Sequence, residues 1–369
     1  MNVAILSPSQ KAYSETFIQA HKTIPDVAVY YYYGDCIPTI LEGEGYISSK
    51  RLTNRIFQKI SNTILNSDLH QNEKALLKSF VKNKIDCVLA EYGTTAACVL
   101  NVCRSLKLPL IAHFHGFDAS IHTVLNDNQQ AYIELFEYAS AIVVVSKVMK
   151  IKLLDLGCSE SKLVYNPYGP DDAFLDICPS FHNEQFIGIG RFVDKKAPYY
   201  TILAFQKILY NHPDARLIIG GDGPLLNTCI NLCKHLKIEN NVTFPGVISP
   251  AQYRKYLGES LAFVQHSITA ENGDMEGTPV GIIEASSAGL PVISTSHAGI
   301  PDVIIHNSTG LLCEEHDVER MAENMLKLLD DKGLAISMGE NGKKNIRNNF
   351  SIKKHLSILR ELINQSVNA

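Results

Sequence analysis

Short apolar runs rich in β-branched residues alternate along the chain with longer stretches in which apolar positions recur every three or four residues. Runs such as IVVV (142–145) and LIIG (217–220) are apolar on both faces, which is typical of strands covered by helices on both sides. Segments such as 201–211 and 318–329 have the helical period instead. This alternation predicts parallel sheets with helical crossovers. We expect strands at 3–7, 27–32, 87–91, 110–114, 142–146 and 164–168, and then at 186–190, 217–220, 242–244, 262–265, 292–294 and 311–313.

Because the series of strands and helices occurs twice, we expect an α/β protein with two Rossmann-like, doubly wound domains. The Pro-, Asp- and Asn-rich stretch 166–185 separates the two series. The predicted domains are therefore 1–172 and 173–345, and 346–369 is expected to form a C-terminal helix that packs back toward the N-terminal domain. Ligands of such sheets bind beyond the carboxyl ends of the strands, so two facing domains predict a central cleft.

The last segment has a clear helical face. Ile352, Leu356, Leu359 and Ile363 fall on one side of a helix, and Ser351 stands where an N-cap is expected.

Composition narrows the class of protein. The hydrophobic share of 46% is that of a globular chain, and 34 Lys and Arg against 38 Asp and Glu give a net charge of −4, which argues against a nucleic-acid binder. No apolar run is long enough to span a bilayer, and the start MNVAILS has no signal-peptide pattern. Nine Cys without any CxxC pair indicate free thiols in a reducing compartment. We therefore expect a cytoplasmic, two-domain enzyme.

The stretch EGTPVGIIEASSAGLPVIST (276–295) contains a predicted helix start. Thr278 is expected to be the N-cap and Pro279 the first helical residue, because Pro has no N–H to leave unsatisfied there. The N–H groups of Val280 and Gly281 would then be free at the positive end of the helix. Such an end binds phosphate or diphosphate groups.

Two carboxylates flank this helix start. Glu276 precedes it and can accept hydrogen bonds from sugar hydroxyls, whereas Glu284 lies within an otherwise apolar segment and needs partners such as ribose hydroxyls. The alternative is an amphipathic helix with a single solvated Glu.

A second candidate group is GRFVDKKAP (190–198), which follows a predicted strand. Arg191 and Lys196 leave the sheet at its carboxyl end, where they can neutralise a leaving diphosphate without a metal ion. Lys195 is expected to face solvent. In isolation this sequence is more often a solvated basic loop.

A third candidate group is HFHGFDAS (113–120). His115 precedes Gly116, so its imidazole is expected to be exposed at a tight turn, with Asp118 near enough to orient it. His113 shares the same strand face and is the alternative. A single His after a strand is more often a structural residue than a catalytic one.

Three signals are weaker. GGDGPLL (220–226) lacks a nucleotide-binding spacing and indicates tight strand-to-helix packing. The turn Pro-Gly-Val that ends at Val247 could present backbone groups to a base edge. Basic side chains in 50–59 and at Lys74, Lys78 and Lys82 could contact an anionic membrane, although a solvated face is the commoner explanation.

Taken together, GRFVDKK, GGDGPL, the E-x7-E pair and AGLPVISTSHAGIPDVI (288–304) resemble the retaining glycosyltransferases of family 4, which have the GT-B fold. SETFI (14–18), HGFD (115–118) and ITAENGDMEGTPV (268–280) are similar to bacterial exopolysaccharide and colanic-acid-type members. The resemblance implies that 173–345 binds the nucleotide sugar and that 1–172 binds the acceptor. Its implied site residues are Arg191 and Lys196 at the diphosphate, Glu284 at the ribose, Glu276 at the transferred sugar with backbone groups of Gly277, Thr278, Pro279 and Val280, and His115 near the anomeric centre. The residue pattern alone adds Val247 as a donor-binding candidate and Asp118 as the support of His115.

The implied reaction is transfer of a hexosyl group, with retention, from a nucleotide diphosphate sugar to a glycan or lipid-linked acceptor in surface polysaccharide or glycolipid synthesis. UDP is the nucleotide that we expect first, no metal or other cofactor is needed, and the enzyme would work in the cytoplasm or peripherally at the inner membrane face. In the family's front-face route a donor phosphate oxygen takes the acceptor proton, and no residue here stands out as a covalent nucleophile. The sequence departs from many members after the first strand, where SPSQKAYSE (7–15) has no Gly, so we assign no phosphate contacts there.

Two other functions fit the same architecture. A nucleotide-sugar epimerase would convert the donor without an acceptor. A non-catalytic nucleotide-sugar-binding protein would bind the donor without converting it.

Overall fold

The chain folds into two compact units. The computed structural model describes residues 1–10, 16–47 and 69–369. Within these, the first unit takes its residues from 1–145, 149–166 and 355–369, and the second is formed by 146–148 and 167–354. The division after Asn166 precedes the predicted one at 172. The return to the first unit begins at His355 instead of 346, because α13 (Lys332–Asn349) packs against α10 (Val280–Ala288) of the second unit.

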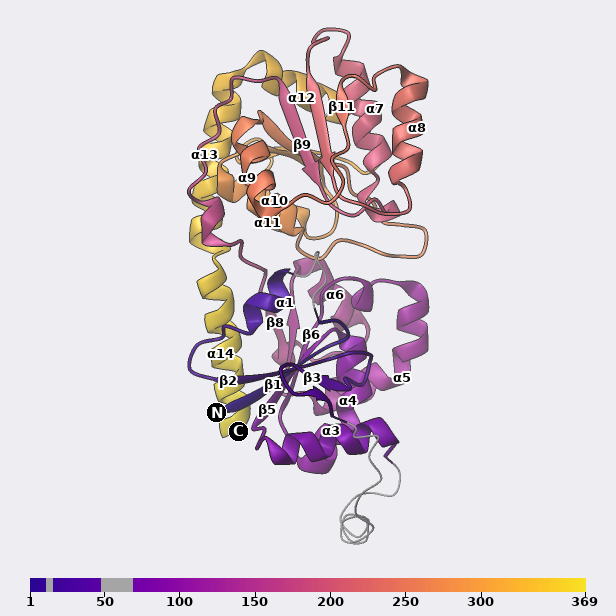
Figure 1. The fold of residues 1–369 in the computed structure, drawn as a ribbon, viewed down its shortest axis with the longest axis vertical. Helices are drawn as coiled ribbons and strands as arrows, with labels where there is room; N and C mark the ends of the chain where they lie inside the picture. Colours follow the sequence, from indigo (N-terminus) through magenta and orange to yellow (C-terminus); the bar gives the residue numbers. More distant parts are fainter. Residues whose placement is uncertain (11–15, 48–68) are drawn as a thin grey trace. The chain divides into compact units, whose positions relative to one another are not determined.

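The first unit is built on an eight-stranded sheet of order β4-β3-β2-β1-β5-β6-β7-β8 (Figure 1). It is parallel except for the pairings of β3 with β2 and β4, and Ala4 of the central β1 lies between Tyr30 and Val88. Its strands are β1 (Asn2–Ser7), β2 (Ala28–Tyr33), β3 (Ile40–Leu41), β4 (Gly45–Tyr46), β5 (Cys87–Glu91), β6 (Leu110–His113), β7 (Ala141–Val144) and β8 (Leu163–Tyr165). The helices of this part of the chain are α1 (Thr16–His21), α3 (Gln71–Lys82), α4 (Gly93–Leu106), α5 (His122–Tyr138), α6 (Lys147–Asp155) and α14 (Ile352–Asn368).

The second unit contains a six-stranded, fully parallel sheet of order β11-β10-β9-β12-β13-β14. Helices α7, α8 and α12 pack together on one face, and α9, α10 and α13 on the other (Figure 1). The strands are β9 (Gln185–Ile189), β10 (Arg216–Gly220), β11 (Val242–Thr243), β12 (Ala262–Gln265), β13 (Val292–Thr295) and β14 (Gly310–Cys313). The remaining helices are α7 (Pro198–Ile208), α8 (Leu226–Leu236), α9 (Pro250–Glu259), α11 (Ile300–Val303) and α12 (Val318–Asp330).

The predicted fold class is confirmed: each unit is a Rossmann-like α/β domain, and all twelve predicted strands are present within three residues of their expected ends. The hairpin β3–β4 was not predicted, since two-residue strands are too short to show a period. The predicted C-terminal helix is α14, and Ser351 caps it by accepting a hydrogen bond from the Lys354 N–H at 3.2 Å. Leu356, Leu359 and Ile363 are buried as the pattern predicted.

The prediction that all nine cysteines are free is wrong for one pair. Cys36, after β2, and Cys98, on α4, form a disulfide across 62 residues of sequence. The other seven are free thiols, and all of these except Cys178 are buried. Spacing along the chain could not reveal the pair, because the topology of the sheet brings the two segments together.

The predicted contact with an anionic membrane stays a prediction. Across residues 1–10, 16–47 and 69–369, none of the helices combines the length and the apolar character needed to cross a bilayer. The basic stretch 50–59 lies outside the described residues. Of the lysines on α3, Lys82 is paired with Glu44 at 2.7 Å, an exposed contact worth little to stability.

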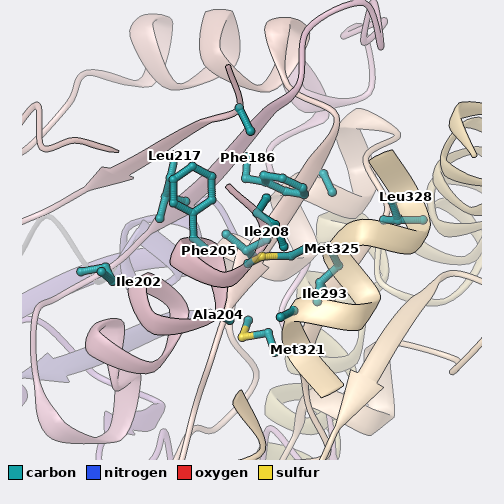
Figure 2. Packing of buried hydrophobic residues seen from close by; sticks show 14 of the residues in the cluster. Phe186, Ile202, Ala204, Phe205, Ile208, Leu217, Ile293, Met321, Met325 and Leu328 are labelled. Atoms are coloured by element: carbon teal, nitrogen blue, oxygen red, sulfur yellow. The ribbon is translucent and has the colours of Figure 1, made fainter. Parts of the chain in front are cut away.

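The core of the second unit lies where α7 and α12 meet over the sheet. Figure 2 shows Phe205 and Ile208 of α7 beside Phe186 of β9 and Met325 of α12. The Phe186 and Phe205 rings meet edge to face with centroids 6.4 Å apart, and both side chains are fully buried.

This packing predicts that Phe205→Ala destabilises the second unit strongly. Removing a fully buried Phe leaves a cavity and costs about 3–5 kcal/mol. The matched control is Tyr210→Ala, just beyond the end of α7 and 93% exposed, which should change the unfolding free energy by less than about 0.5 kcal/mol. Urea denaturation measures both, and equal effects of the two substitutions would contradict this account of the core.

Candidate active site

The carboxyl edge of the second sheet carries most of the predicted chemistry. The loops that follow β9, β10 and β11 are tied together there by backbone hydrogen bonds. Gly190 N–H donates to Gly220 O at 3.0 Å, Phe192 N–H to Asp222 O at 2.9 Å, and Gly221 N–H to Gly246 O at 2.8 Å. These bonds fix where Arg191 and its neighbours leave the sheet.

The glycines of GGDGPLL serve packing between these loops. Gly221 has φ +135°, and a Cβ there would collide with the carbonyl oxygen of Gly190. Gly223 packs in the same way against the backbone of Phe192. The predicted packing role is therefore confirmed, and α8 begins only after this loop.

Arg191 and Lys196 line one small cavity of about 30 Å³, together with Gln265 at the end of β12. Arg191 is exposed, and its guanidinium forms no ion pair within the described ranges. Lys196 Nζ lies 3.1 Å from Glu276 Oε1 and 3.3 Å from Gln265 Oε1. Burial lowers the pKa of Lys196, as do Lys195 and Arg191, and Glu276 opposes that shift. Two cationic side chains, those of Arg191 and Lys196, thus lie at the carboxyl edge of the second sheet.

Lys195 does not face solvent, contrary to the prediction. Its side chain is buried, with Nζ 2.9 Å from Asp274 Oδ1 and donating to Met275 O at 3.0 Å. The 3₁₀ turn Asp194–Lys196 rotates the two successive lysines apart, so that each enters the protein beside a different acid. Lys195 therefore anchors the loop that carries Glu276.

Glu276 presents a buried carboxylate with unused acceptor capacity. Its side chain is 7% exposed, and among the described residues the partner of Oε1 is Lys196 Nζ, at 3.1 Å. Burial raises the pKa of this carboxyl, but the charges of Lys196 and Lys195 outweigh it and lower the pKa overall. The Glu276 carboxylate is thus ionised and can accept a hydrogen bond from a hydroxyl group.

Two residues that sequence reasoning missed hold Glu276 in place. The Glu276 N–H donates to Nε2 of the fully buried His297 at 3.1 Å, and His297 Nδ1 lies 2.6 Å from Glu315 Oε1. Although burial raises the pKa of Glu315, hydrogen bonds from Thr269 and His297 lower it, so the carboxylate is the acceptor. His297 therefore carries its proton on Nδ1. Both residues closely follow strands (β13 and β14), which is the signal that could have found them.

Helix α10 begins one residue later than predicted. Pro279, with φ −73° and ψ 108°, is the N-cap, and Val280 is the first helical residue. Thr278 is buried and lies before the cap. Within the ranges that the structure describes, neither Val280 N–H nor Gly281 N–H donates a hydrogen bond, as expected for a helix start. The carbonyl of Gly277 packs so closely on Gly299 that a Cβ at Gly299 would clash with it, which fixes the approach to the helix.

Glu284 lies one turn into α10, and its carboxylate accepts no hydrogen bond from any described residue. Burial raises the pKa of Glu284 to about 8, and Asp171 contributes to the rise. Tyr253 is close by, but its hydroxyl donates to Gly281 O at 3.3 Å instead. The predicted need for partners is therefore not met by the protein itself.

Val247 follows β11 in the loop that is bonded to Gly221. Its side chain is 56% exposed. The loop lies two strands from Arg191 in the sheet order. A role at a nucleotide base remains a prediction for this residue.

In the first unit, the predicted arrangement of His115 and Asp118 needs two corrections. His115 was expected to be exposed to solvent, but it is buried, with an exposed fraction of 8%. Asp118 does not orient the imidazole, since its carboxylate accepts the backbone N–H groups of Gly93, His115 and Gly116 at 2.8–3.0 Å. The imidazole instead meets Glu91, with Nε2 2.8 Å from Oε2. Glu91 ends the apolar strand CVLAE, a signal that was available in the sequence.

Comparison with known proteins places these residues in a family. The profile described as "Glycosyl transferases group 1" matches residues 182–345. The amylovoran biosynthesis glycosyltransferase AmsK of Erwinia amylovora is 30% identical over 70% of this chain and 66% of its own length. The putative colanic acid biosynthesis glycosyltransferase WcaL of Escherichia coli is 27% identical over 66% of this chain and 61% of its own.

The fold has a close structural neighbour as well. HepE of Anabaena, crystallised with UDP and glucose, superimposes with a TM-score of 0.79 over 99% of this chain and all of that one, at 15% identity. That similarity concerns the fold, which is GT-B. The matches to AmsK and WcaL span about two thirds of those relatives or less. The motifs, the matched profile and the relatives agree, and the chain belongs to the group 1 glycosyltransferases, family 4.

Proposed function

We propose that this protein transfers a hexosyl group, with retained configuration, from a nucleotide diphosphate sugar to a hydroxyl of a glycan or lipid-linked acceptor. The observation that carries the proposal is the convergence on the second sheet of polar groups that keep unused hydrogen-bonding capacity. Arg191, Lys196, the first amides of α10 and the carboxylates of Glu276 and Glu284 all lie near its carboxyl edge. Each of them lacks a full complement of protein partners.

The cations and the helix start are suited to a diphosphate. Arg191 offers a planar fork to two oxygens, and Lys196 offers a compact charge. The N–H groups of Val280 and Gly281 add donors at the positive end of α10. As charge builds on the leaving diphosphate, these groups stabilise the transition state more than the bound substrate, so no divalent ion is required.

The two carboxylates are suited to hydroxyls. Glu276 would accept hydrogen bonds from the transferred sugar, with the backbone of Gly277 to Val280 beside it. Glu284 would accept from the ribose, and the ribose hydroxyls would supply the partners that the protein does not. Val247 would contact the base, and His115, by resemblance to the family, would lie near the anomeric carbon.

The proposed glycosyl transfer needs no covalent enzyme intermediate. The bond from the anomeric carbon to the diphosphate oxygen breaks, and the acceptor oxygen bonds to that carbon on the same face. The acceptor proton passes to an oxygen of the departing phosphate. The protein's part is to position both substrates and to stabilise negative charge.

The biological setting follows from the relatives. AmsK and WcaL are named for amylovoran and colanic acid synthesis, and HepE was crystallised with UDP. We therefore propose UDP-sugars as first donors, surface polysaccharide or glycolipid synthesis as the process, and the cytoplasm or the inner membrane face as the place of action.

Lys196→Met tests the diphosphate contact. Loss of one donor to the developing charge typically lowers the rate about 100- to 1,000-fold, so transfer should fall by that factor with the donor that works best in a panel of UDP- and GDP-sugars. The matched control is Lys207→Met, because the ammonium of Lys207 on α7 is paired with Glu319 of α12 at 2.6 Å. The control should retain the wild-type rate, and EDTA should leave both proteins unaffected. Full activity of Lys196→Met would remove its role.

Incubation with the nucleotide sugar alone separates the other functions. The proposed transferase should leave the donor sugar's configuration unchanged and release product only when an acceptor is present. Conversion of the sugar without an acceptor would identify an epimerase. Tight binding with neither reaction would identify a non-catalytic binding protein.

Donor affinity should increase with pH through Glu284. Because its pKa is about 8 in the free protein, the carboxyl is mostly protonated at pH 6, whereas a ribose hydroxyl donates best to the ionised form. Affinity for a nucleotide sugar should therefore rise by up to about tenfold per unit from pH 6 and level off above pH 8. Glu284→Gln should flatten this dependence. Calorimetric titrations at pH 6, 7 and 8.5 measure it, and a wild-type affinity that falls with pH would contradict the role of Glu284.

A further inference from the structure

A buried cluster of four imidazoles and one carboxylate lies at the carboxyl ends of β5 and β6 in the first unit. None of its side chains except that of His115 belongs to the site proposed above. The residues come from four segments of the chain, and their exposed fractions run from 0% to 8%. The members are His21 at the end of α1, Glu91 at the end of β5, His113 at the end of β6, His115 after it, and His355 in the first turn of α14.

Hydrogen bonds connect the cluster through Glu91. Its Oε1 lies 2.6 Å from His21 Nδ1, and its Oε2 lies 2.8 Å from His115 Nε2. His21 Nε2 lies 2.8 Å from His355 Nε2, which extends the chain of contacts to α14. One carboxylate therefore links two imidazoles directly and a third through His21.

The carboxylate determines where the protons lie. Burial alone raises the pKa of Glu91, but the charge of His21 and the hydrogen bonds from His115 and His21 lower it to about 2. An ionised carboxylate can only accept, so His21 must donate through Nδ1 and His115 through Nε2. In neutral His115 the lone pair is therefore on Nδ1. The opposite tautomer would set two lone pairs against each other at 2.8 Å.

A bound metal ion does not explain this arrangement. His21, Glu91 and His113 have ligand atoms within 4.8 Å of one another. A tetrahedral zinc ion holds its nitrogen and oxygen ligands at ~2.0–2.1 Å, which separates the ligand atoms by roughly 3.3 Å. The contacts of 2.6 Å and 2.8 Å to Glu91 are shorter than that and have the length of charge-assisted hydrogen bonds.

The ring of His113 packs against that of His115. Their centroids are 4.3 Å apart with the rings tilted, and His21 stacks on His113 at 5.2 Å. Burial drives the pKa of His113 well below its usual value, and the neighbouring imidazoles add to this, so this ring is neutral. The ring of His115 is thus held by a hydrogen bond along one edge and by contact with a neutral ring.

We propose that Glu91 is a positioning residue for the glycosyl transfer. It fixes the tautomer and orientation of His115 and is itself held by His21, which His355 of the C-terminal helix holds in turn. The inference rests on the proposed function for the role of His115 near the transferred sugar. A carboxylate that positions an imidazole in this way acts through that ring without touching the substrate.

Glu91→Gln tests the inference in two ways. Gln has one acceptor oxygen where Glu has two, so at least one of the bonds to His21 and His115 is lost along with the charge. In the free protein labelled with ¹⁵N-histidine, the wild type should show a hydrogen-bonded Nε2 proton for His115, identified by its absence in His115→Gln. Glu91→Gln should shift that resonance. Its kcat for transfer should fall about 100-fold, the usual cost of a misplaced group, while the donor KM stays within about twofold.

The matched control is Glu73→Gln, in the same unit. Glu73 is also a buried acid, 3% exposed, but its carboxylate only caps α3 and contacts Asn101. This control should lower the melting temperature without moving the His115 resonance or kcat. Glu91→Asp keeps the charge with a shorter reach, and it should give an intermediate kcat even where the Gln variant does not fold.

Three results would overturn the inference. They are an unchanged His115 resonance and kcat in both Glu91 variants, equal losses in Glu73→Gln, and stoichiometric Zn²⁺ binding that depends on His21 and Glu91. The spectra are recorded without substrate, so they test the hydrogen bonds of Glu91 independently of the transfer reaction. Absence of transfer by the wild type with every donor tested would instead refute the proposed function, and with it the catalytic part of this inference.

Discussion

The buried ion pair between Lys196 and Glu276 is the contact around which the second unit's site is arranged. Both charges leave water, and desolvation of such a pair can cost as much as its attraction returns. A carboxylate can accept more hydrogen bonds than this one contact at 3.1 Å, and an ammonium can donate three, so each partner keeps unused capacity. Lys195 and Asp274 form a second pair beside it and tie down the same loop. The arrangement is better suited to receiving a charged, hydroxyl-rich ligand than to stabilising the free protein.

The two units use the same device to place a functional group. In the second unit an ionised Glu315 sets the tautomer of His297, which then accepts the backbone N–H of Glu276. In the first unit an ionised Glu91 meets His115 directly. In each case the carboxylate lies at or just beyond the carboxyl end of a buried strand, where parallel sheets place their binding groups. Rigid strands and fixed tautomers together reduce the reorganisation that a reaction would need.

Sequence periodicity was sufficient for the strands and for the fold class, because a strand covered on both faces must be apolar throughout. Arg191, Lys196, Glu276 and Glu284 were predicted from motifs instead, and the structure places each of them at or near the carboxyl edge of the second sheet, whereas their roles stay predictions. Sequence reasoning failed where a single turn of the backbone decides which way a side chain points. Spacing cannot distinguish Lys195 from Lys196, and only the 3₁₀ turn before α7 separates them.

Partners that are distant in sequence were missed for a related reason. Glu91 and His115 are 24 residues apart, and His21 and His355 are 334 apart, so no local pattern connects them. Asp118 was assigned to the imidazole because it is a neighbour in sequence, but the turn directs its carboxylate to three backbone N–H groups. A carboxylate that satisfies a tight turn is not available to orient a side chain, so the strand-end Glu91 has that role.

Buried polar groups without partners carry the strongest information about a ligand. Native proteins satisfy nearly all such groups, and each exception calls for an explanation. In the stretch from Glu276 to Glu284 the buried exception is Glu276 Oε1, whose contact is the ion pair with Lys196. Close to it, the half-buried N–H groups of Val280 and Gly281 and the half-buried carboxylate of Glu284 make no hydrogen bond with any described residue, and the pKa of Glu284 is raised. A polar group that is withdrawn from water without a full set of partners raises the free energy of the folded chain, so packing alone does not explain the placement of Glu276. A ligand that brings phosphate oxygens for the amides and hydroxyls for the carboxylates satisfies all of them at once, and a nucleotide diphosphate sugar has both.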